Sequence, residues 1–205
     1  MNILITAGGT REYIDPVRFI SNASTGKMGY ALARAAIKAG HKVTLITAPT
    51  NLRRPPAAKI VDVETSAQMF EAVKVNFPKS DCLIMAAAVS DYKPAKQSKT
   101  KIKKSASELT LSLKPTQDIL KWAGRNKKKN QVIAGFALED KSLKKNAEQK
   151  MLQKNLDMII ANAPAAIAAR TSTVHIKTSN SPWQTLTTKS KQTTAKKIIE
   201  LANFL

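Results

Sequence analysis

The segment 2–40, NILITAGGTREYIDPVRFISNASTGKMGYALARAAIKAG, decides the fold. Residues 2–7 form a short apolar run that stops at Gly8 and Gly9, a pattern typical of a buried parallel strand ending in a turn. Residues 26–39 are rich in alanine with apolar residues at helical spacing, and Gly40 supplies a stop signal. A strand, a glycine-bearing loop and a helix in this order predict the start of an open α/β sheet.

The same alternation continues along the chain. We expect further strands at 42–47, 59–63, 81–89, 131–136 and 157–161, and helices at 66–77, from about Thr116, at 139–153 and at 194–205. Thr65 is the expected N-cap of the second helix. Residues 101–113 alternate around a polar centre and predict a hairpin or projecting flap, and 174–187 predict two late strands. The predicted fold class is α/β, with one doubly wound, Rossmann-like, mostly parallel sheet and a projecting β-hairpin flap, in a single domain over residues 1–205.

The charge balance narrows the classes of ligand. The chain of 205 residues carries 34 Lys and Arg against 14 Asp and Glu, for a net charge of +20. Such a field attracts polyanions, which include both nucleic acids and polyphosphate substrates. Aromatic residues make up only 5% and form no stacking series, so specific nucleic-acid binding is disfavoured. Lysine runs such as 127–129 and 144–145 are typical of solvated helix ends or loops.

The lengths of the apolar runs and the start of the sequence predict the cellular compartment. Residues 82–89 form one of the longest runs, and it is far too short to cross a bilayer. Met1 leads directly into a strand rather than into a charged and apolar leader, so we expect a cytoplasmic protein with no membrane partner. Cys82 lies inside an apolar run, where a small buried side chain is expected rather than a nucleophile.

The loop between the first strand and the first helix holds the candidate phosphate-binding residues. In an open parallel sheet, ligands bind beyond the carboxyl ends of the strands, where a helix N-terminus offers free N–H groups and a positive dipole. The candidates are glycines that let an anion approach, hydroxyl donors and one lysine: Gly8, Gly9, Thr10, Ser24, Thr25, Gly26 and Lys27. Neither standard phosphate loop fits, because Lys27 is followed by Met28 and residues 47–50 after the second strand contain no acid. Close packing of the helix is the expected reason for Gly29.

Several motifs that span nearly the whole chain resemble one family. They are TAGGTREYIDPVRFISNASTGKMG at 6–29, AAAVSDYKP at 86–94, KIKK at 101–104, QDIL at 117–120, GFALE at 135–139 and KNLDMIIAN at 154–162. In this order they resemble phosphopantothenoylcysteine synthetase, also called phosphopantothenate-cysteine ligase, the synthetase domain of the bifunctional protein of bacterial coenzyme A biosynthesis. The resemblance implies a ligase that joins 4'-phosphopantothenate to cysteine, usually with CTP and Mg²⁺. An acyl cytidylate forms with release of pyrophosphate, and the cysteine amine then displaces CMP.

The resemblance also implies roles for particular residues. Asn22 matches the asparagine that holds the acyl intermediate, Arg18 matches an arginine near it, and Lys101 matches the lysine of a flexible motif associated with nucleotide activation. These three are the catalytic candidates. The nucleotide contacts that it implies are Ala87, Ala88, Asp91, Lys101, Gln117, Asp118, Ile119, Leu120, Phe136, Lys150 and Lys154. Asn162 lies in a family motif, but we assign it no role.

The resemblance further implies partners. A homodimer is expected, with the flap at 101–113 near the partner's site. Many bacterial relatives carry a flavin-dependent decarboxylase ahead of this domain, so we expect association with that enzyme. The chain is then either a stand-alone synthetase or an excised domain.

The implied chemistry fits the residue types. Activation of a carboxylate by a nucleotide needs no protein nucleophile, because substrate atoms form each new bond, so positioning and charge neutralisation dominate. The sequence shows no Gly-x-Ser-x-Gly elbow, no cysteine and histidine pairing and no metal-ligand cluster. Mg²⁺ is expected to be held mainly by the triphosphate, so no metal ligands are predicted.

Alternatives remain open at this point. A Rossmann-type NAD(P)-dependent oxidoreductase fits the fold, and a basic nucleic-acid-binding protein fits the charge. The sequence does not distinguish CTP from ATP, since base choice depends on the shape of the pocket. On spacing alone, KIKK is also typical of a solvated edge strand, and Asn22 of a helix N-cap.

Overall fold

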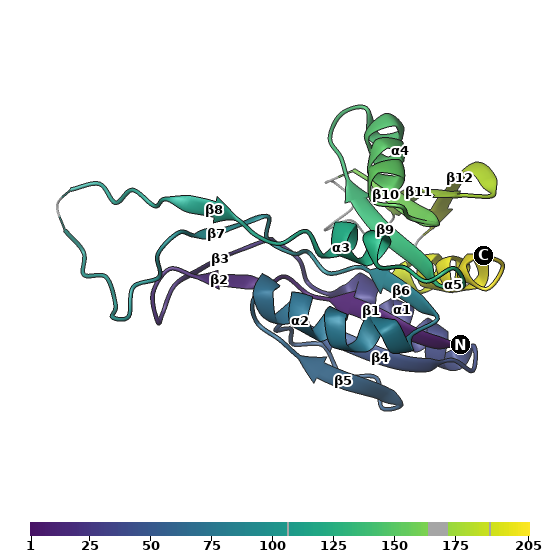
Figure 1. Cartoon of the computed structure of the whole chain (residues 1–205), viewed down its shortest axis with the longest axis horizontal. Helices are drawn as coiled ribbons and strands as arrows, with labels where there is room; N and C mark the ends of the chain where they lie inside the picture. The colour runs from purple at the N-terminus through teal and green to yellow at the C-terminus, as the bar shows by residue number, and fades with distance from the viewer. Residues whose placement is uncertain (106, 164–171, 189) are drawn as a thin grey trace.

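A computed structural model of the chain describes residues 1–105, 107–163, 172–188 and 190–205. One sheet of eight strands forms its centre, in the order β12-β11-β10-β9-β6-β1-β4-β5 (Figure 1). Parallel strands make up most of it: β1 (Asn2–Ala7), β4 (Lys42–Thr47), β5 (Ala58–Asp62), β6 (Cys82–Met85), β9 (Val132–Leu138) and β10 (Met158–Asn162). The late strands β11 (Ser172–Thr178) and β12 (Ser181–Thr188) are antiparallel. The predicted doubly wound, mostly parallel sheet is confirmed.

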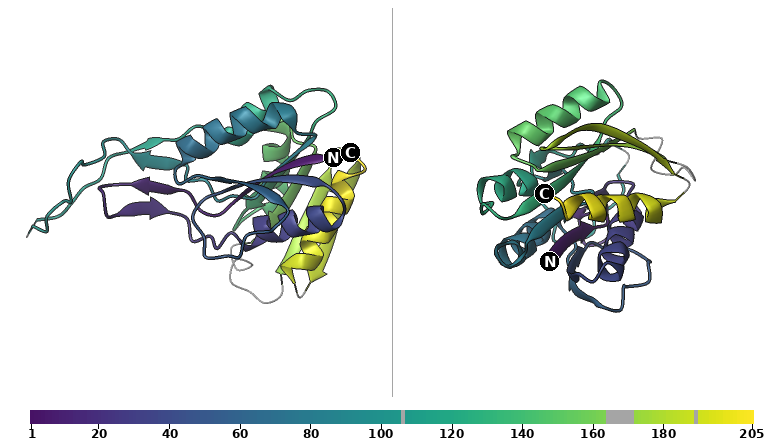
Figure 2. Two further views of the ribbon diagram at one scale, coloured as in Figure 1. Left: turned by 90° about the horizontal axis from the view of Figure 1, so that it is seen from below. Right: turned by 90° about the vertical axis from the view of Figure 1, so that its right-hand side faces the viewer.

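Helices cover both faces of the sheet. On one face, α1 (Lys27–Lys38) and α5 (Lys191–Ala202) lie side by side (Figure 2). The other face carries α2 (Ser66–Asn76) with the short 3-10 turn η1 (Phe77–Lys79), α3 (Ile119–Arg125) and α4 (Leu143–Gln153). Side chains alternate along each strand, so Ile3 and Ile5 are buried under α1 and α5 while Leu4 is buried in the opposite core. Burial on both faces explains the continuous apolar runs of the central strands.

The topological switch point of the sheet lies between β1 and β6. From β1 the chain passes to β4 and β5 on one side, and then crosses back through α2 to β6 on the other. Ligands of such sheets bind where the two directions diverge, beyond the carboxyl ends of the strands. Gly29 brings α1 close to this point, because a Cβ there would lie 2.5 Å from the Cβ of Ala7.

A long extension projects from the carboxyl edge of the sheet (Figures 1 and 2). Two small antiparallel sheets build it: β2 (Arg11–Tyr13) pairs with β3 (Phe19–Ser21), and β7 (Tyr92–Pro94) pairs with β8 (Leu113–Pro115). The predicted flap therefore exists, but its hairpin pairs 92–94 with 113–115. The described residues of 101–112 form no strand, because this lysine-rich segment is the long loop between the paired strands.

Several boundaries differ from those predicted, and nearby hydrogen bonds explain two of them. The strand expected at 81–89 ends at Met85, since the N–H of Ala88 turns to the carbonyl of Gly8 at 2.8 Å. The helix expected from Thr116 begins at Ile119, where Asp118 caps it, because the N–H of Thr116 bonds to the carbonyl of Asp91. The last two helices begin at Leu143 and Lys191 rather than at 139 and 194.

The predicted helix caps have mixed outcomes. Thr65 caps α2 in a complete capping box with Gln68, as expected. Asn22 is not an N-cap, since α1 begins after Gly26, whose left-handed backbone (φ 73°) provides no side-chain cap.

Cys82 is fully buried, as predicted. No helix in the described part of the chain is long and apolar enough to span a bilayer.

Candidate functional site

Hydrogen bonds across the switch point tie the end of β1 to the end of β6. Thr10 is buried and donates its N–H to the carbonyl of Ala88, while its hydroxyl oxygen accepts from the N–H of Ser90 at 2.9 Å. Thr116 extends the network with a 2.6 Å bond from its hydroxyl to the carbonyl of Ser90. The loops after β1, β6 and β8 are therefore held as one rigid floor.

Asn22, which directly follows β3, is hydrogen-bonded to this floor. Its side-chain nitrogen donates to the carbonyls of Ala88 and Val89, both at 3.2 Å. The amide orientation is determined, because the oxygen of the flipped amide would face two acceptors. The side-chain oxygen has no hydrogen-bond partner among the described residues. Asn22 is thus a fixed polar group at the switch point.

The predicted phosphate-binding loop folds closely around the end of β1. Gly8 and Gly26 both have left-handed backbones, and a Cβ on Gly26 would lie 3.3 Å from the Cα of Gly8. Ser24 accepts the N–H of Gly26 at 3.3 Å. The structure brings Gly8, Gly9, Thr10, Ser24 and Gly26 together beside the uncapped N-terminus of α1, an arrangement suited to an anion.

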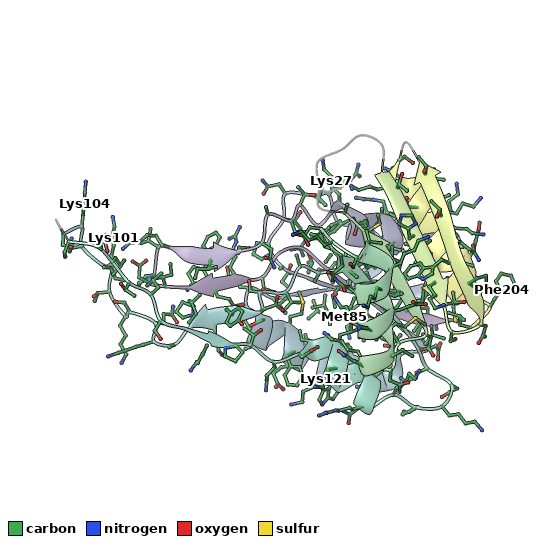
Figure 3. The ribbon with its side chains drawn as sticks, turned by 90° about the horizontal axis from the view of Figure 1, so that it is seen from above. Lys27, Met85, Lys101, Lys104, Lys121 and Phe204 are labelled. Carbon is green, nitrogen blue, oxygen red and sulfur yellow. The ribbon has the colours of Figure 1, made fainter. Side chains whose placement is uncertain are left out.

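The last two loop candidates, Thr25 and Lys27, take no part in these contacts among the described residues. Thr25 accepts a weak bond at its carbonyl from Thr50, at 3.4 Å. Lys27 is exposed and lies on the side of the body opposite Lys121 (Figure 3). Their phosphate-binding roles therefore remain predictions from the sequence pattern of the loop.

A cleft of about 350 Å³ opens next to this floor, above β6 and β9. Its walls come from the segment after β6, from residues 115–120 at the start of α3, and from α4. Predicted nucleotide contacts line most of it: Ala87, Asp91, Gln117, Asp118, Ile119, Leu120, Phe136, Lys150 and Lys154. Segments far apart in the sequence thus converge on one cleft beside Asn22. Ala88 is not among its lining residues, and it instead binds Asn22 and Thr10 through its carbonyl.

Two lysines give the cleft its charge. The Nζ of Lys150 donates to the carbonyl of Phe136 at 2.8 Å, and burial, together with the nearby Lys154, lowers the pKa of Lys150. Lys154 forms an ion pair with Asp118 at 2.8 Å. Burial raises the pKa of Asp118, but its bonds to Lys154 and to the N–H of Lys121 outweigh this and hold the pKa below its usual value. Asp91 and Asp118 line the same cleft, but the Nζ of Lys150 is bonded to a carbonyl rather than to a carboxylate, so its charge can offset that of a phosphate.

Lys101 and Arg18 are not brought to this cleft. Arg18 follows the turn of the β2–β3 hairpin, where it binds Asp15 and donates to the carbonyl of Ile102 at 2.7 Å. Lys101 is exposed near the far end of the extension, away from Met85 on the cleft wall (Figure 3). Within one chain, neither of these two catalytic candidates lines the cleft that holds the nucleotide contacts.

A larger cavity of about 540 Å³ lies over the ends of β4 and β5. Several of its polar side chains are already engaged within the protein: Arg54 pairs with Asp62 at 2.8 Å, and Gln68 accepts from the backbone N–H groups of Glu64 and Thr65. None of these groups was predicted to bind a ligand. The cleft above β6 and β9 is therefore the stronger candidate site.

The sequence interpretation missed several residues of the site. Ser90 and Thr116 hold the floor, Tyr92 lines the cleft, and Asp15 binds both the hairpin and the flap. Only Asp15 carried a local signal, since an acid three residues before Arg18 at a turn predicts a short-range ion pair. The other contacts join segments at least 26 positions apart, and no local pattern reveals them.

Comparisons with known proteins identify relatives that belong to one family. The profile of the family described as "DNA/pantothenate metabolism flavoprotein C-terminal domain" matches residues 1–204. The chain is 48% identical over 162 residues to the coenzyme A biosynthesis bifunctional protein CoaBC of Bacillus subtilis (strain 168), covering 78% of this chain and 40% of that protein. The chain thus spans less than half the length of this relative.

Solved structures share the fold over the whole chain. A crystal structure of the C-terminal domain of a CoaBC protein has a TM-score of 0.85 and 35% identity, covering 99% of this chain and 94% of the other. A DNA/pantothenate metabolism flavoprotein from Streptococcus pneumoniae has a TM-score of 0.86 and 27% identity, covering 100% and 99%. The profile match, the sequence identity and the shared fold together show that this chain belongs to the DNA/pantothenate metabolism flavoprotein C-terminal domain family.

Proposed function

We propose that the chain is a ligase that forms the amide bond between 4'-phosphopantothenate and cysteine, with activation by CTP. One observation carries the proposal: the cleft that gathers Asp91, Lys150 and Lys154 opens beside Asn22 at the switch point. A bound nucleotide and a carboxylate substrate would meet there. Coenzyme A biosynthesis by the relatives supports this assignment.

The reaction has two steps. A carboxylate oxygen of 4'-phosphopantothenate attacks the α-phosphorus of CTP, and the bond to pyrophosphate breaks. The cysteine amine then attacks the acyl carbon of the cytidylate, CMP leaves with the bonding electrons, and the amine loses a proton. No protein nucleophile takes part, so the protein contributes position and charge.

Charge neutralisation is the main task of the cleft. Two anionic substrates repel each other, and Lys150 and Lys154 offset that repulsion from one wall. Asn22 is fixed by the carbonyls of Ala88 and Val89 and offers an uncharged polar group to the acyl or phosphate oxygens. An amide suits this position because a carboxylate there would repel both substrates.

Mg²⁺ fits this cleft as a companion of the triphosphate. Of the carboxylates that line it, Asp118 is engaged with Lys154, which leaves Asp91 to reach the ion. Mg²⁺ retains most of its waters and is held mainly by phosphate oxygens in such sites. When bound, it neutralises charge on the triphosphate.

We further propose that two copies of the chain complete each other's site. Large side chains with apolar surface are exposed along the extension, as is typical of an interface between subunits: Val17, Phe19, Tyr92, Leu109, Leu111 and Leu113. Lys101 and Arg18 lie on the same extension, away from their own cleft. A twofold dimer that buries these apolar residues would carry Lys101 and Arg18 of one copy to the cleft of the other.

Its cellular setting follows from the relatives. We place the enzyme in the cytoplasm, in association with the flavin-dependent decarboxylase that acts before it in the same biosynthesis. Bifunctional CoaBC relatives, of which the chain spans less than half, support this partner.

The assay for this function measures pyrophosphate. The protein is incubated with 4'-phosphopantothenate, Mg²⁺ and either CTP or ATP, with and without cysteine. Pyrophosphate with CTP, and phosphopantothenoylcysteine only when cysteine is added, are expected. Equal rates with ATP would overturn the choice of nucleotide, and absence of pyrophosphate with both would overturn the ligase.

A matched pair of lysine variants locates the reaction in the cleft. Lys150→Gln removes a cation from the cleft wall, and Lys145→Gln removes an exposed one from the same helix. We expect the first to raise the KM for CTP about tenfold or more, because a charged hydrogen bond is lost. The second is expected to leave it unchanged, and equal effects would contradict this cleft as the nucleotide site.

A further inference from the structure

Asp15 occupies an unusual place for an acidic residue with no role in the proposed reaction. Its side chain is inaccessible to solvent although it lies at the tip of an exposed hairpin. One carboxylate oxygen accepts from the N–H groups of Val17 and Arg18, at 2.9 and 2.8 Å. The other accepts from the guanidinium of Arg18, with 3.0 Å to Nε, and from the N–H of Ile102 at 3.1 Å.

These bonds join two segments that are 87 positions apart in the sequence. Arg18 closes the connection, because its guanidinium also donates to the carbonyl of Ile102 at 2.7 Å. Both backbone groups of Ile102 are thereby held by one acid and one arginine of the β2–β3 hairpin. A third bond, from the N–H of Ser98 to the carbonyl of Ile14 at 2.9 Å, fixes the start of the same loop.

The held residue is the immediate neighbour of Lys101. Fixing the backbone of Ile102 fixes where Lys101 leaves the extension, while the lysine side chain itself remains exposed. The Arg18 guanidinium beside Asp15 holds the pKa of that carboxyl well below its usual value, so the connection stays charged at neutral pH. Charged hydrogen bonds of this kind are the strong ones.

We propose that Asp15 is a positioning residue for the amide-forming reaction: through Arg18 and the backbone of Ile102, it holds the flap so that Lys101 is presented in one place. The inference rests on the proposed function, because it takes Lys101 as the group that acts. Without Asp15, Ile102 keeps the bond from Arg18 to its carbonyl, but Arg18 loses the ion pair that holds its guanidinium there, so Lys101 would sample more positions. Turnover would fall through lost positioning, while the nucleotide cleft would be unchanged.

The test variant is Asp15→Asn, with Glu12→Gln as its matched control. Glu12 lies on the same hairpin, is also buried, and accepts the N–H of Ser66 at 2.7 Å, but its carboxylate has no hydrogen bond to the described residues of the 95–112 loop. Both variants remove one buried carboxylate charge from β2 or its turn. In Asp15→Asn, the amide nitrogen replaces one carboxylate oxygen and faces either the backbone N–H groups of Val17 and Arg18 or both the Arg18 guanidinium and the N–H of Ile102. In either orientation the bonds to that atom are lost, and the negative charge that pairs with Arg18 is removed.

Three measurements on the full chain decide the inference. Hydrogen exchange of a peptide covering 98–104 should be about tenfold faster in Asp15→Asn and unchanged in Glu12→Gln. The kcat for pyrophosphate release should fall about tenfold or more, with KM for CTP within about twofold. In a Lys101→Gln background, Asp15→Asn should cause no further loss, because its effect passes through that lysine.

Each arm has an outcome that overturns the inference. Unchanged exchange at 98–104 would show that Asp15 does not hold the flap. Faster exchange with unchanged kcat, or additive losses with Lys101→Gln, would show that the anchor does not act through Lys101. If Asp15→Asn fails to fold, Ile102→Pro removes the same flap N–H while keeping the carboxylate, and the same loss is expected.

Failure of the proposed function would look different. The wild-type protein would then release no pyrophosphate, and hydrogen exchange in Asp15→Asn would still decide whether Asp15 anchors the flap. If the wild-type protein shows no turnover, the proposed ligase function is overturned. If the wild-type protein turns over normally and Asp15→Asn has the same kcat, only the positioning role of Asp15 is overturned.

Discussion

Asn22 shows how a single side chain can serve both the scaffold and the chemistry. Its amide nitrogen bridges two carbonyls of the loop after β6, and its oxygen has no hydrogen-bond partner among the described residues. Sequence spacing alone left helix capping as an alternative role. The structure removes that alternative, because Gly26 occupies the cap position.

Asn22→Asp should therefore impair turnover and leave the fold intact. A carboxylate would face the carbonyl oxygens of Ala88 and Val89 and lose both donated bonds, and its charge would repel the phosphates. We expect the rate of phosphopantothenoylcysteine formation to fall about a hundredfold, measured by product chromatography. Asn51→Asp, on an exposed loop, is the control and should retain full activity. Normal product formation by Asn22→Asp would contradict the role.

Lys150 provides a prediction about pH. Burial, then the nearby Lys154, lower its pKa from 10.5, so Lys150 loses its charge at a lower pH than an exposed lysine does. The cation is present below the lowered pKa and is lost as pH rises through it. The kcat/KM for CTP should then fall on the alkaline side before pH 10.5, as measured by pyrophosphate release across a pH series. Lys150→Gln should abolish this decline and Lys145→Gln should keep it; an unchanged alkaline decline in Lys150→Gln would assign it to another group.

At the scale of elements, α3 connects stability to the cleft. This helix has only seven residues, and its first turn, with Ile119 and Leu120, lines the cleft. Asp118 caps it through the N–H of Lys121 at 2.9 Å and pairs with Lys154. A helix this short depends on its cap and its packing, because nucleation is costly.

Removing that cap should therefore lower the stability of the protein and weaken the binding of CTP in the cleft. Asp118→Ala is expected to cost about 1 kcal/mol of unfolding free energy and to raise the KM for CTP several-fold, measured by urea denaturation and pyrophosphate release. Asp118→Asn can still cap and should recover the stability. Thr65→Ala removes the cap of α2, away from the cleft, and should lose similar stability with an unchanged KM. A raised KM in Thr65→Ala would mean that general destabilisation explains both.

The elements that the sequence predicted well are those with a strong local cause. Strands β1, β4, β6, β9 and β10 are buried on both faces and appear as apolar runs, and α1 shows helical spacing beside its glycines. The hairpin β2–β3 has only three residues per strand, and its place depends on contacts with the distant flap, such as Ser98 with Ile14. No window of sequence contains both partners, so neither this hairpin nor the register of β7 with β8 could be predicted.

The candidate site, like the fold, could be predicted only in part from the sequence. The resemblance named most residues of the cleft, and the structure gathers them, but their roles stay predictions. The sequence could not supply the distance between Lys101 and the cleft, since motifs taken in order do not show that Lys101 lies far out on an extension, next to the Ile102 that Arg18 binds. That separation comes from the length of the two hairpins, which is a property of the whole molecule.

The shape of the whole molecule leads to a prediction about subunits. If the extension of one copy completes the cleft of the other, Asn22 and Lys101 of a given site belong to different chains. A dimer of one Asn22→Asp chain and one Lys101→Gln chain then has one doubly defective site and one site with both native residues. If the two residues act within one chain, both sites of that mixed dimer are defective.

Co-expression of the two variants with different tags separates these cases. Each variant alone should be nearly inactive, whereas an equal mixture should regain about a quarter of wild-type activity, because about half the dimers are mixed and each has one native site. Two Lys101→Gln chains with different tags are the control and should regain none. Recovery would also place the exposed apolar side chains of the extension, such as Leu111 and Leu113, in the interface, because only that contact brings the flap to the partner. A mixture as inactive as its components would mean that the flap must bend back to its own cleft, against the anchor that Asp15 provides.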